Sequence, residues 1–290
     1  MMKIAFLMQC HKNPEQINLL LKALKHPQVD VYVHVDSKSE SIREDIGEGD
    51  GIYLLPKKDS IDVQWGQFSQ VQATLNLLNA AISGGGGYSH YFLISGQDFP
   101  LKSIGEIVKF LNEHKNENFI DCALIKQFEK RNDIYFPRIV VGRKKWQKIL
   151  KNILVYGTGG WNHTFSLVRR TAPGSVQYYF GSSWWCLNDA VVQWIYNFLG
   201  KCPEYIELFK HSLCPDECFF QTLVMNSPYA DNIKPYLHYI KWENGMSSPK
   251  TLTTIDYEEL KKTEKIIARK FDMNVDAEII RKLYCVIKAN

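Results

Sequence analysis

Short apolar runs alternate with amphipathic segments over the first hundred residues, and few folds accommodate such an order. Four runs have the length and the apolar or period-two pattern of strands, at residues 3–8, 29–35, 51–55 and 91–94. Segments with helical spacing follow them, beginning near residues 14, 67 and 104. This alternation predicts an α/β fold with a mostly parallel central sheet flanked by helices.

Three loops that follow the predicted strands are where a ligand is expected. In open parallel sheets, ligands bind outside the carboxyl ends of the strands. That rule nominates residues 9–13, 36–39 and 96–101. The chain of 290 residues shows no internal repeat and no clear linker, so a single domain over residues 1–290 is the simplest organisation.

Charge and motif content exclude several classes of function. Lys plus Arg (35) exceed Asp plus Glu (31) by only 4, which does not predict nucleic-acid binding. The dinucleotide fingerprint and the P-loop are absent. No two Asp residues are two positions apart, so the D-x-D pair that holds Mn²⁺ in many sugar-nucleotide enzymes is missing. His211, Cys214 and Cys218 fit no common zinc spacing, and no metal site is predicted.

The cysteines and the N-terminal segment bear on the compartment. Seven cysteines at irregular spacing are interpreted as reduced thiols. No run reaches the ~18 apolar residues that a membrane span needs. The apolar run near the N-terminus has no small-residue cleavage site after it, so a signal peptide is not predicted.

Two adjacent acids, Asp216 and Glu217, are the most suggestive local element. They follow Pro215 at the start of a helix predicted over residues 216–224. One interpretation is structural, because a helix start favours proline and acidic side chains. The other is that one of the two carboxylates points into a cleft as a general base, a role that suits it if partial burial raises its pKa.

Two further segments combine aromatic and basic side chains. Trp184 and Trp185 are adjacent indoles that can form a sugar platform; on a strand they would face opposite sides, so at most one lines a site and the other is core. Near the C-terminus, Arg269 and Lys270 precede Phe271. For these cations the alternative interpretation is the solvated C-terminal end of a helix.

Positive charge concentrates in the segment 126–151. It holds nine basic and two acidic residues, a local charge of +7 that leaves −3 for the rest of the chain. Trp146, Ile149 and Leu150 are interleaved with these cations. A solvated amphipathic helix is one interpretation. The other is contact with an anionic surface, either a lipid-diphosphate-linked acceptor or the membrane that holds it.

Taken together, these segments resemble the core-2/I-branching N-acetylglucosaminyltransferase and peptide O-xylosyltransferase family, glycosyltransferase family 14. The resemblance spans almost the whole chain and rests on motifs in the family's order: Cys10-His11, His34–Ser39, Val63–Gly66 with Ser69–Ala73, Leu93–Leu101, Gly181–Trp185, Pro215–Glu217 and Ala268–Asp272. The chain also departs from the family. Gln70 stands where the animal enzymes have Arg, and another family Arg has no match, Lys250 being the nearest cation.

The resemblance implies a GT-A-like fold, a UDP-sugar donor, and inversion at the anomeric carbon without a metal ion or other cofactor. It implies that Glu217 is the catalytic base, that Asp36 holds the uridine and that Lys270 contacts the diphosphate. The full donor-binding set that it implies is Cys10, His11, Asp36, Gly96, Asp98, Arg269 and Lys270. Trp184 and Trp185 fall where the acceptor sugar is gripped.

The resemblance also suggests organisation, partners and location. Residues 1–125 would form the nucleotide-sugar-binding half, and residues 126–290 the acceptor-binding and catalytic half. The donor would carry N-acetylglucosamine or xylose, the acceptor would be a glycan, and no nucleic acid would bind. Lacking the family's luminal disulfides and anchor, the chain is expected to be bacterial and cytoplasmic, at most peripheral at the inner face of the membrane.

Two other classes remain as alternatives. One is a nucleotide- or carbohydrate-binding module of the same fold that has lost activity, and an intact Glu217 speaks against it. The other is a nucleotidyltransferase on a similar sheet. The missing glycine-rich phosphate loops and metal-site acids speak against that enzyme.

Overall fold

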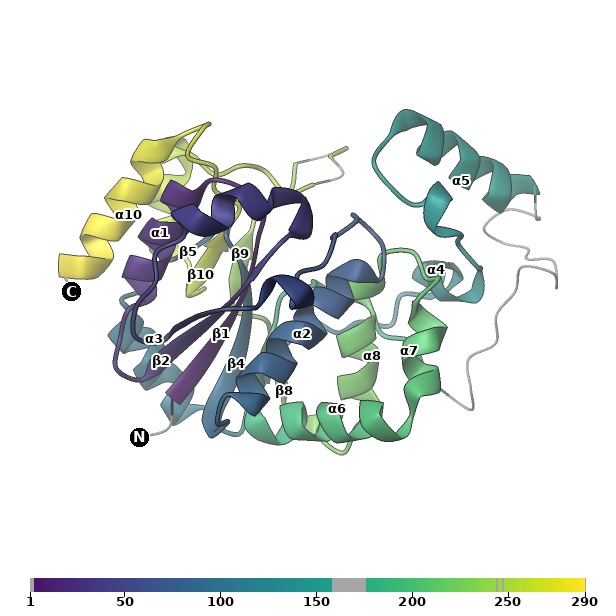
Figure 1. The fold of residues 1–290 in the computed structure, drawn as a ribbon, viewed down its shortest axis with the longest axis horizontal. Coiled ribbons are helices and arrows are strands. Elements are labelled where there is room, and N and C mark those ends of the chain that lie inside the picture. The colour runs from purple at the N-terminus through teal and green to yellow at the C-terminus, as the bar shows by residue number, and fades with distance from the viewer. Residues whose placement is uncertain (1–2, 158–175, 244, 247, 290) are drawn as a thin grey trace.

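The computed structural model describes residues 3–157, 176–243, 245–246 and 248–289, and a seven-stranded sheet forms its centre (Figure 1). The strand order is β3-β2-β1-β4-β7-β6-β8, and all of these strands except β7 run in the same direction. The predicted mostly parallel α/β architecture is confirmed. The strands are β1 (Lys3–Cys10), β2 (Val29–Val35), β3 (Ile52–Leu54), β4 (Tyr88–Ser95), β6 (Asn118–Phe119), β7 (Cys186–Asn188) and β8 (Ile233–Lys234).

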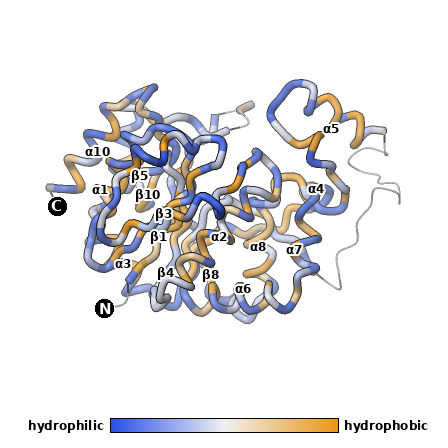
Figure 2. The backbone as a smooth tube through the Cα atoms, in the orientation of Figure 1, coloured by the Kyte–Doolittle hydropathy of each residue, from blue (hydrophilic) through white to orange (hydrophobic). Residues whose placement is uncertain are grey.

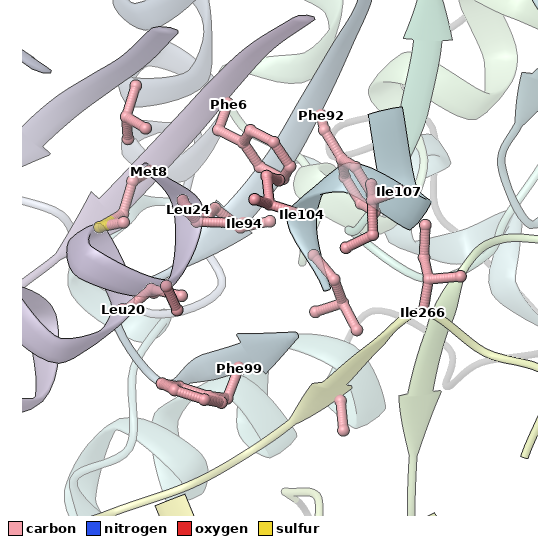
Figure 3. Packing of buried hydrophobic residues seen from close by; sticks show 14 of the residues in the cluster. Phe6, Met8, Leu20, Leu24, Phe92, Ile94, Phe99, Ile104, Ile107 and Ile266 are labelled. Carbon is pink, nitrogen blue, oxygen red and sulfur yellow. The ribbon is translucent and has the colours of Figure 1, made fainter. Parts of the chain in front are cut away.

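Helices cover both faces of this sheet, which explains why β1 is apolar from Ile4 to Met8. Phe6 and Met8 belong to the core on one face, whereas Ala5 and Leu7 belong to the core on the other. A strand buried on both sides needs apolar residues at every position. The first face packs against α1 (Pro14–Leu24), α3 (Ile104–Glu113) and α10 (Ala277–Ala289). Figure 3 shows side chains of α1 and α3 against Phe6 and Met8 of β1. The second packs against α2 (Ser69–Ser83), α6 (Asp189–Lys201), α7 (Pro203–Phe209) and α8 (Phe219–Met225).

The helix boundaries follow local signals in the sequence. Pro14 occupies the first turn of α1, where its missing N–H costs no helical hydrogen bond. Ser103 and Glu106 form a reciprocal capping box at the start of α3. Helix α2 ends at Gly84, the first residue of the glycine run.

A second, three-stranded sheet corrects the prediction for the C-terminal region. Its order is β5-β10-β9, with β5 at Asp98–Pro100, β9 at His238–Ile240 and β10 at Ile267–Arg269. The interpretation of Arg269 as the last turn of a helix is therefore wrong. The preceding helix, α9 (Tyr257–Lys262), ends earlier, and Arg269 lies on a strand held between two partner strands.

The part of the chain between β6 and β7 carries the basic segment 126–151. It contains the short helix α4 (Lys130–Asp133) and the longer α5 (Lys145–Gly157), which lies at the far side of the molecule from α10 (Figure 1). Hydrophobic and hydrophilic stretches alternate along α5 in Figure 2. Among the described residues, no helix combines the length and the apolar character needed to cross a bilayer.

Candidate functional site

A cleft lies at the carboxyl ends of β1, β2 and β4, and it consists of two adjoining cavities. The strand-end cavity, of about 320 Å³, is lined by residues that directly follow these three strands. The Glu217 cavity, of about 360 Å³, is lined by Asp216 and Glu217 together with residues of the second half of the chain. Both are lined by Trp65, Gln70, Arg143, Trp184 and Arg269, so they share one wall.

The strand-end cavity is lined by residues from all three nominated loops. Cys10 and His11 come at the end of β1, Asp36 follows β2, and Ser95 and Gln97 come at the end of β4. The carboxylate of Asp36 accepts a hydrogen bond from the backbone N–H of Lys38 at 3.0 Å, which fixes its direction. The rule that ligand sites form outside strand ends therefore located a real cavity.

Cys10 and His11 line this cavity as neutral groups. Burial raises the pKa of the Cys10 thiol to about 12, so no thiolate is available near neutral pH. Burial and the neighbouring Lys12 lower the pKa of His11 and favour the uncharged imidazole. These two neutral side chains can hydrogen-bond a ligand without adding charge to the cavity.

Gly96 and Asp98 were expected to line the cavity, and the structure corrects this. Asp98 is completely buried; it accepts a hydrogen bond from the backbone N–H of Ser95 at 2.9 Å and lies 3.2 Å from the Arg269 guanidinium. A Cβ at Gly96 would come within 3.0 Å of the Cys10 Cβ and 3.1 Å of Ile17. Asp98 and Gly96 therefore contact residues that line the cavity, Arg269 and Cys10, but do not line it themselves.

Arg269 and Trp184 form the shared wall. The Arg269 guanidinium carbon lies 3.8 Å from the centre of the Trp184 ring, a cation–π contact that also packs both groups. Burial lowers the pKa of Arg269, and its Nε has no hydrogen-bond partner among the described residues. A buried cation with spare donors is suited to binding an anion.

The paired indoles lie in different environments, although they directly precede β7 and are not part of it. Trp184 is half-buried and lines both cavities, whereas Trp185 is completely buried and packs 5.1 Å from the Phe220 ring centre. The prediction that at most one of them lines a site is confirmed. The assignment of Trp185 to acceptor binding is wrong, because its side chain belongs to the core.

Glu217 lies in the Glu217 cavity with an arginine partner. It ends a 3₁₀ turn at Pro215–Glu217, not the first turn of an α-helix as predicted. Its side chain is 39% exposed, and its Oε2 accepts a hydrogen bond from Arg131 Nη1 at 2.6 Å. The Arg131 guanidinium lies 3.9 Å from the Phe128 ring centre. Stacking on that ring fixes the arginine and, through it, the carboxylate.

Asp216 differs from its neighbour in environment. Its Oδ2 accepts a hydrogen bond from Ser183 Oγ at 2.7 Å, while its Oδ1 is buried and unpartnered within the described part of the chain. Burial, followed by the nearby Glu217 charge, raises the pKa of Asp216 to about 7. The two acids thus provide one exposed, arginine-paired carboxylate and one that is partly protonated at neutral pH.

Lys270 approaches the Glu217 cavity indirectly. Its ammonium donates to Ser248 Oγ at 3.4 Å, and Ser248 lines that cavity. Burial and the nearby cations Arg143, Arg269 and Lys12 lower the pKa of Lys270. The strand-end cavity is lined by three cations, Lys38, Arg143 and Arg269, and one carboxylate, Asp36, so it is electropositive. Over the described ranges, no three His, Cys, Asp or Glu side chains gather as a metal-binding group would.

Sequence reasoning missed several cleft residues. Trp65 and Gln70 stand in the quoted motifs 63–66 and 69–73 but were not assigned to the site. Arg131 and Arg143 were counted only in the basic segment 126–151. No local pattern places either arginine in the cleft, because each reaches it through contacts with residues distant in the sequence.

The family model described as Core-2/I-Branching enzyme matches residues 4–265. The chain belongs to this family of glycosyltransferases. Xylosyltransferase 2 of Canis lupus familiaris is 23% identical over 310 residues, which cover 97% of this chain and 33% of that protein. Xylosyltransferase oxt of Drosophila melanogaster is 24% identical with the same coverage. The chain thus spans about a third of the length of these relatives.

A solved structure of a xylosyltransferase can also be superposed on the family member described here. Mouse xyloside xylosyltransferase 1 in its apo form covers 92% of this chain and 97% of its own, with 11% sequence identity and a TM-score of 0.38. A TM-score this low carries no weight for the fold or for the site.

Proposed function

We propose that this family member is an inverting glycosyltransferase that moves a sugar from a UDP-sugar to a glycan hydroxyl, without a metal ion and with Glu217 as base. The observation that carries the proposal is the wall shared by the two cavities. Trp184 and Arg269 face the strand-end cavity and the Glu217 cavity alike. A donor in the first and an acceptor in the second would meet there, within reach of one carboxylate.

The strand-end cavity suits the nucleotide. Asp36 offers a fixed carboxylate to ribose or base, and the neutral Cys10 and His11 add uncharged contacts. Arg269 and Lys270 supply positive charge for the diphosphate. Fixed cations aimed at a leaving group stabilise the charge that develops on it, which is the role that a metal ion has in other transferases.

The reaction follows from this arrangement. The acceptor oxygen attacks the anomeric carbon on the face opposite the diphosphate, and the Glu217 carboxylate takes the hydroxyl proton. The bond from the anomeric carbon to the diphosphate oxygen breaks, and its electron pair leaves with UDP. Arg131 holds the Glu217 carboxylate in place through the hydrogen bond to its Oε2, which leaves Oε1 to accept the proton.

The sugar is proposed as xylose or N-acetylglucosamine. The matched relatives are named as xylosyltransferases, whereas the family model is named for branching enzymes. The test is a thermal-shift panel of UDP-xylose, UDP-N-acetylglucosamine, UDP-glucose and UDP-galactose, followed by transfer and hydrolysis assays with and without EDTA. A donor at a hundred times its Kd should add about 2.7 kcal/mol to the free energy of unfolding.

The panel distinguishes the proposal from its alternatives. EDTA-resistant turnover of one UDP-sugar is the expected result. A thermal shift with no turnover would indicate a binding module. Turnover that EDTA abolishes would refute metal independence.

We further propose that α5 contacts an anionic membrane surface. One side of the helix exposes a stripe of large apolar side chains, 44–66% exposed: Trp146, Ile149, Ile153 and Tyr156. Soluble proteins rarely leave such a stripe in water, and Lys145 and Lys148 next to it match the charge of anionic lipid. The opposite side anchors the helix, because Val155 is buried in a small core cluster.

Vesicle co-sedimentation tests this contact. The full chain should sediment with vesicles containing phosphatidylglycerol and much less with neutral vesicles. The substitutions Ile149→Ser and Ile153→Ser together should release it, because they remove the apolar stripe and keep every lysine. Failure to sediment with either vesicle, or no effect of the double substitution, would contradict the contact.

A further inference from the structure

The cations around the cleft are not equally matched by carboxylates. Four of them have ion-pair partners: Lys12 with Asp272, Lys38 with Asp36, Arg131 with Glu217, and Arg269 with Asp98. Arg143 and Lys270 have none among the described residues. Lys250, the nearest cation to the family's unmatched arginine, is bound to the buried Asp256 at 2.8 Å. Arg143 therefore brings an uncompensated charge into both cavities, and Lys270 adds a second one beside them, as an anionic ligand requires.

Arg143 is placed at the cleft by its neighbours along the chain. It precedes α5, and the carbonyl of the buried Val141 accepts a hydrogen bond from Gln67 Nε2 at 2.9 Å. Gln67 also donates to the carbonyl of Arg138 at 2.9 Å. These bonds attach the loop that carries Arg143 to the residues preceding α2. The position of the arginine is therefore a consequence of the fold around Gln67.

The Arg143 side chain turns toward both cavities. It lines each of them, and its guanidinium carbon lies 5.3 Å from the centre of the Trp65 ring, which lines both as well. Its charge also contributes to lowering the pKa of His11 and of Lys270, which shows that it is near both. Trp65 offers a ring face that orients the planar guanidinium.

We propose that Arg143 binds the donor diphosphate together with Lys270, reaching it from the loop that precedes α5. The inference rests on the proposed function and assigns a second phosphate-binding residue to it. When the anomeric carbon–oxygen bond breaks, its electron pair remains on the diphosphate. Arg143 stabilises that charge through hydrogen bonds, and no proton passes to it. A guanidinium suits this role because it can donate to two phosphate oxygens at once.

The assignment predicts a specific pattern of binding. Arg143 should affect ligands with phosphates and leave the uridine alone, since the ribose and base contacts come from the strand ends. A surface arginine that only adds to the general positive field would instead act like its neighbour Lys144. That residue is equally exposed and lines neither cavity.

Calorimetry of UDP and uridine binding to the full chain tests the proposal, with Arg143→Gln and the matched control Lys144→Gln. Arg143→Gln should weaken UDP binding at least about tenfold, as expected for the loss of a charge-assisted hydrogen bond, and change uridine binding less than about twofold. Lys144→Gln should change both less than about twofold.

Three results would overturn the inference: unchanged UDP affinity in Arg143→Gln, an equal loss in Lys144→Gln, or a parallel loss of uridine binding. Failure of the proposed function is distinguishable from these. A wild-type chain that binds neither UDP nor uridine would refute the nucleotide site itself. A wild-type chain that binds UDP while Arg143→Gln binds it equally well refutes only the role of Arg143.

Discussion

Replacing Glu217 by glutamine tests the proposed chemistry with little disturbance of the structure. The substitution keeps the size of the side chain and an oxygen that can accept the hydrogen bond from Arg131. It removes the basic carboxylate that would take the acceptor proton. The structure therefore predicts that Glu217→Gln loses transfer activity while the fold and the donor site are retained.

The magnitudes separate these two effects. Glu217 is 39% exposed, so the loss of its ion pair with Arg131 should change the free energy of unfolding by at most about 1 kcal/mol. Loss of a general base typically lowers kcat by about 10²–10⁴-fold, which corresponds to about 3–5 kcal/mol in the activation barrier. The affinity for UDP should stay within about twofold, because no proposed contact to UDP involves Glu217.

The assay is the initial rate of transfer at saturating donor, with UDP affinity by calorimetry and Tm measured on the same preparations. Glu207→Gln is the matched control, since Glu207 is also an ion-paired glutamate, bound to Lys210 on the surface and outside both cavities. It should retain wild-type activity. Turnover of Glu217→Gln within about tenfold of wild type would show that Glu217 is not the base.

Further predictions concern other residues of the cleft. Lys270→Ala should weaken UDP binding and lower turnover, and unchanged UDP affinity by calorimetry would remove Lys270 from the diphosphate site. Trp185→Ala should lower the free energy of unfolding by about 3–5 kcal/mol because Trp185 is completely buried. Trp184→Ala should instead raise the KM for the acceptor, and chemical denaturation with kinetics distinguishes the two. The pKa of Asp216, raised by burial to about 7, means that the folded chain retains a proton that the unfolded chain releases above about pH 4. The free energy of unfolding should therefore fall as pH rises from about 4 to 7, and Asp216→Asn should flatten that slope in a series of Tm measurements.

The first half of the fold was predictable because its signals are local. The apolar runs of β1 and β4 are long, and Pro14 and the glycine run at Gly84 mark helix boundaries. Strand β10 was not predictable. It has three residues, its last residue Arg269 and the following Lys270 are cations typical of a helix end, and it is stabilised by pairing with β5 and β9, which are distant in the sequence.

The site was predictable where it depends on strand ends. That rule placed Asp36 and Cys10 in a cavity. The expectation that only one of Trp184 and Trp185 lines a site agrees with the structure, although the two residues precede β7 and are not part of it. Prediction failed where a side chain reaches the cleft from a loop. Arg143 is an example, because its position depends on hydrogen bonds from Gln67 that no pattern around residue 143 reveals.

Asp216 and Glu217 lie in unlike environments, and this difference bears on which acid of the pair we propose as the base. Asp216 accepts a hydrogen bond from Ser183, its other carboxylate oxygen is buried, and burial raises its pKa to about 7. The side chain of Glu217 is 39% exposed and accepts a hydrogen bond from Arg131. Adjacent acids in unlike environments take unlike roles. The proposal assigns the proton transfer to Glu217 because an acceptor hydroxyl can reach it more easily, and a partly neutral Asp216 limits the repulsion between two carboxylates in one cavity.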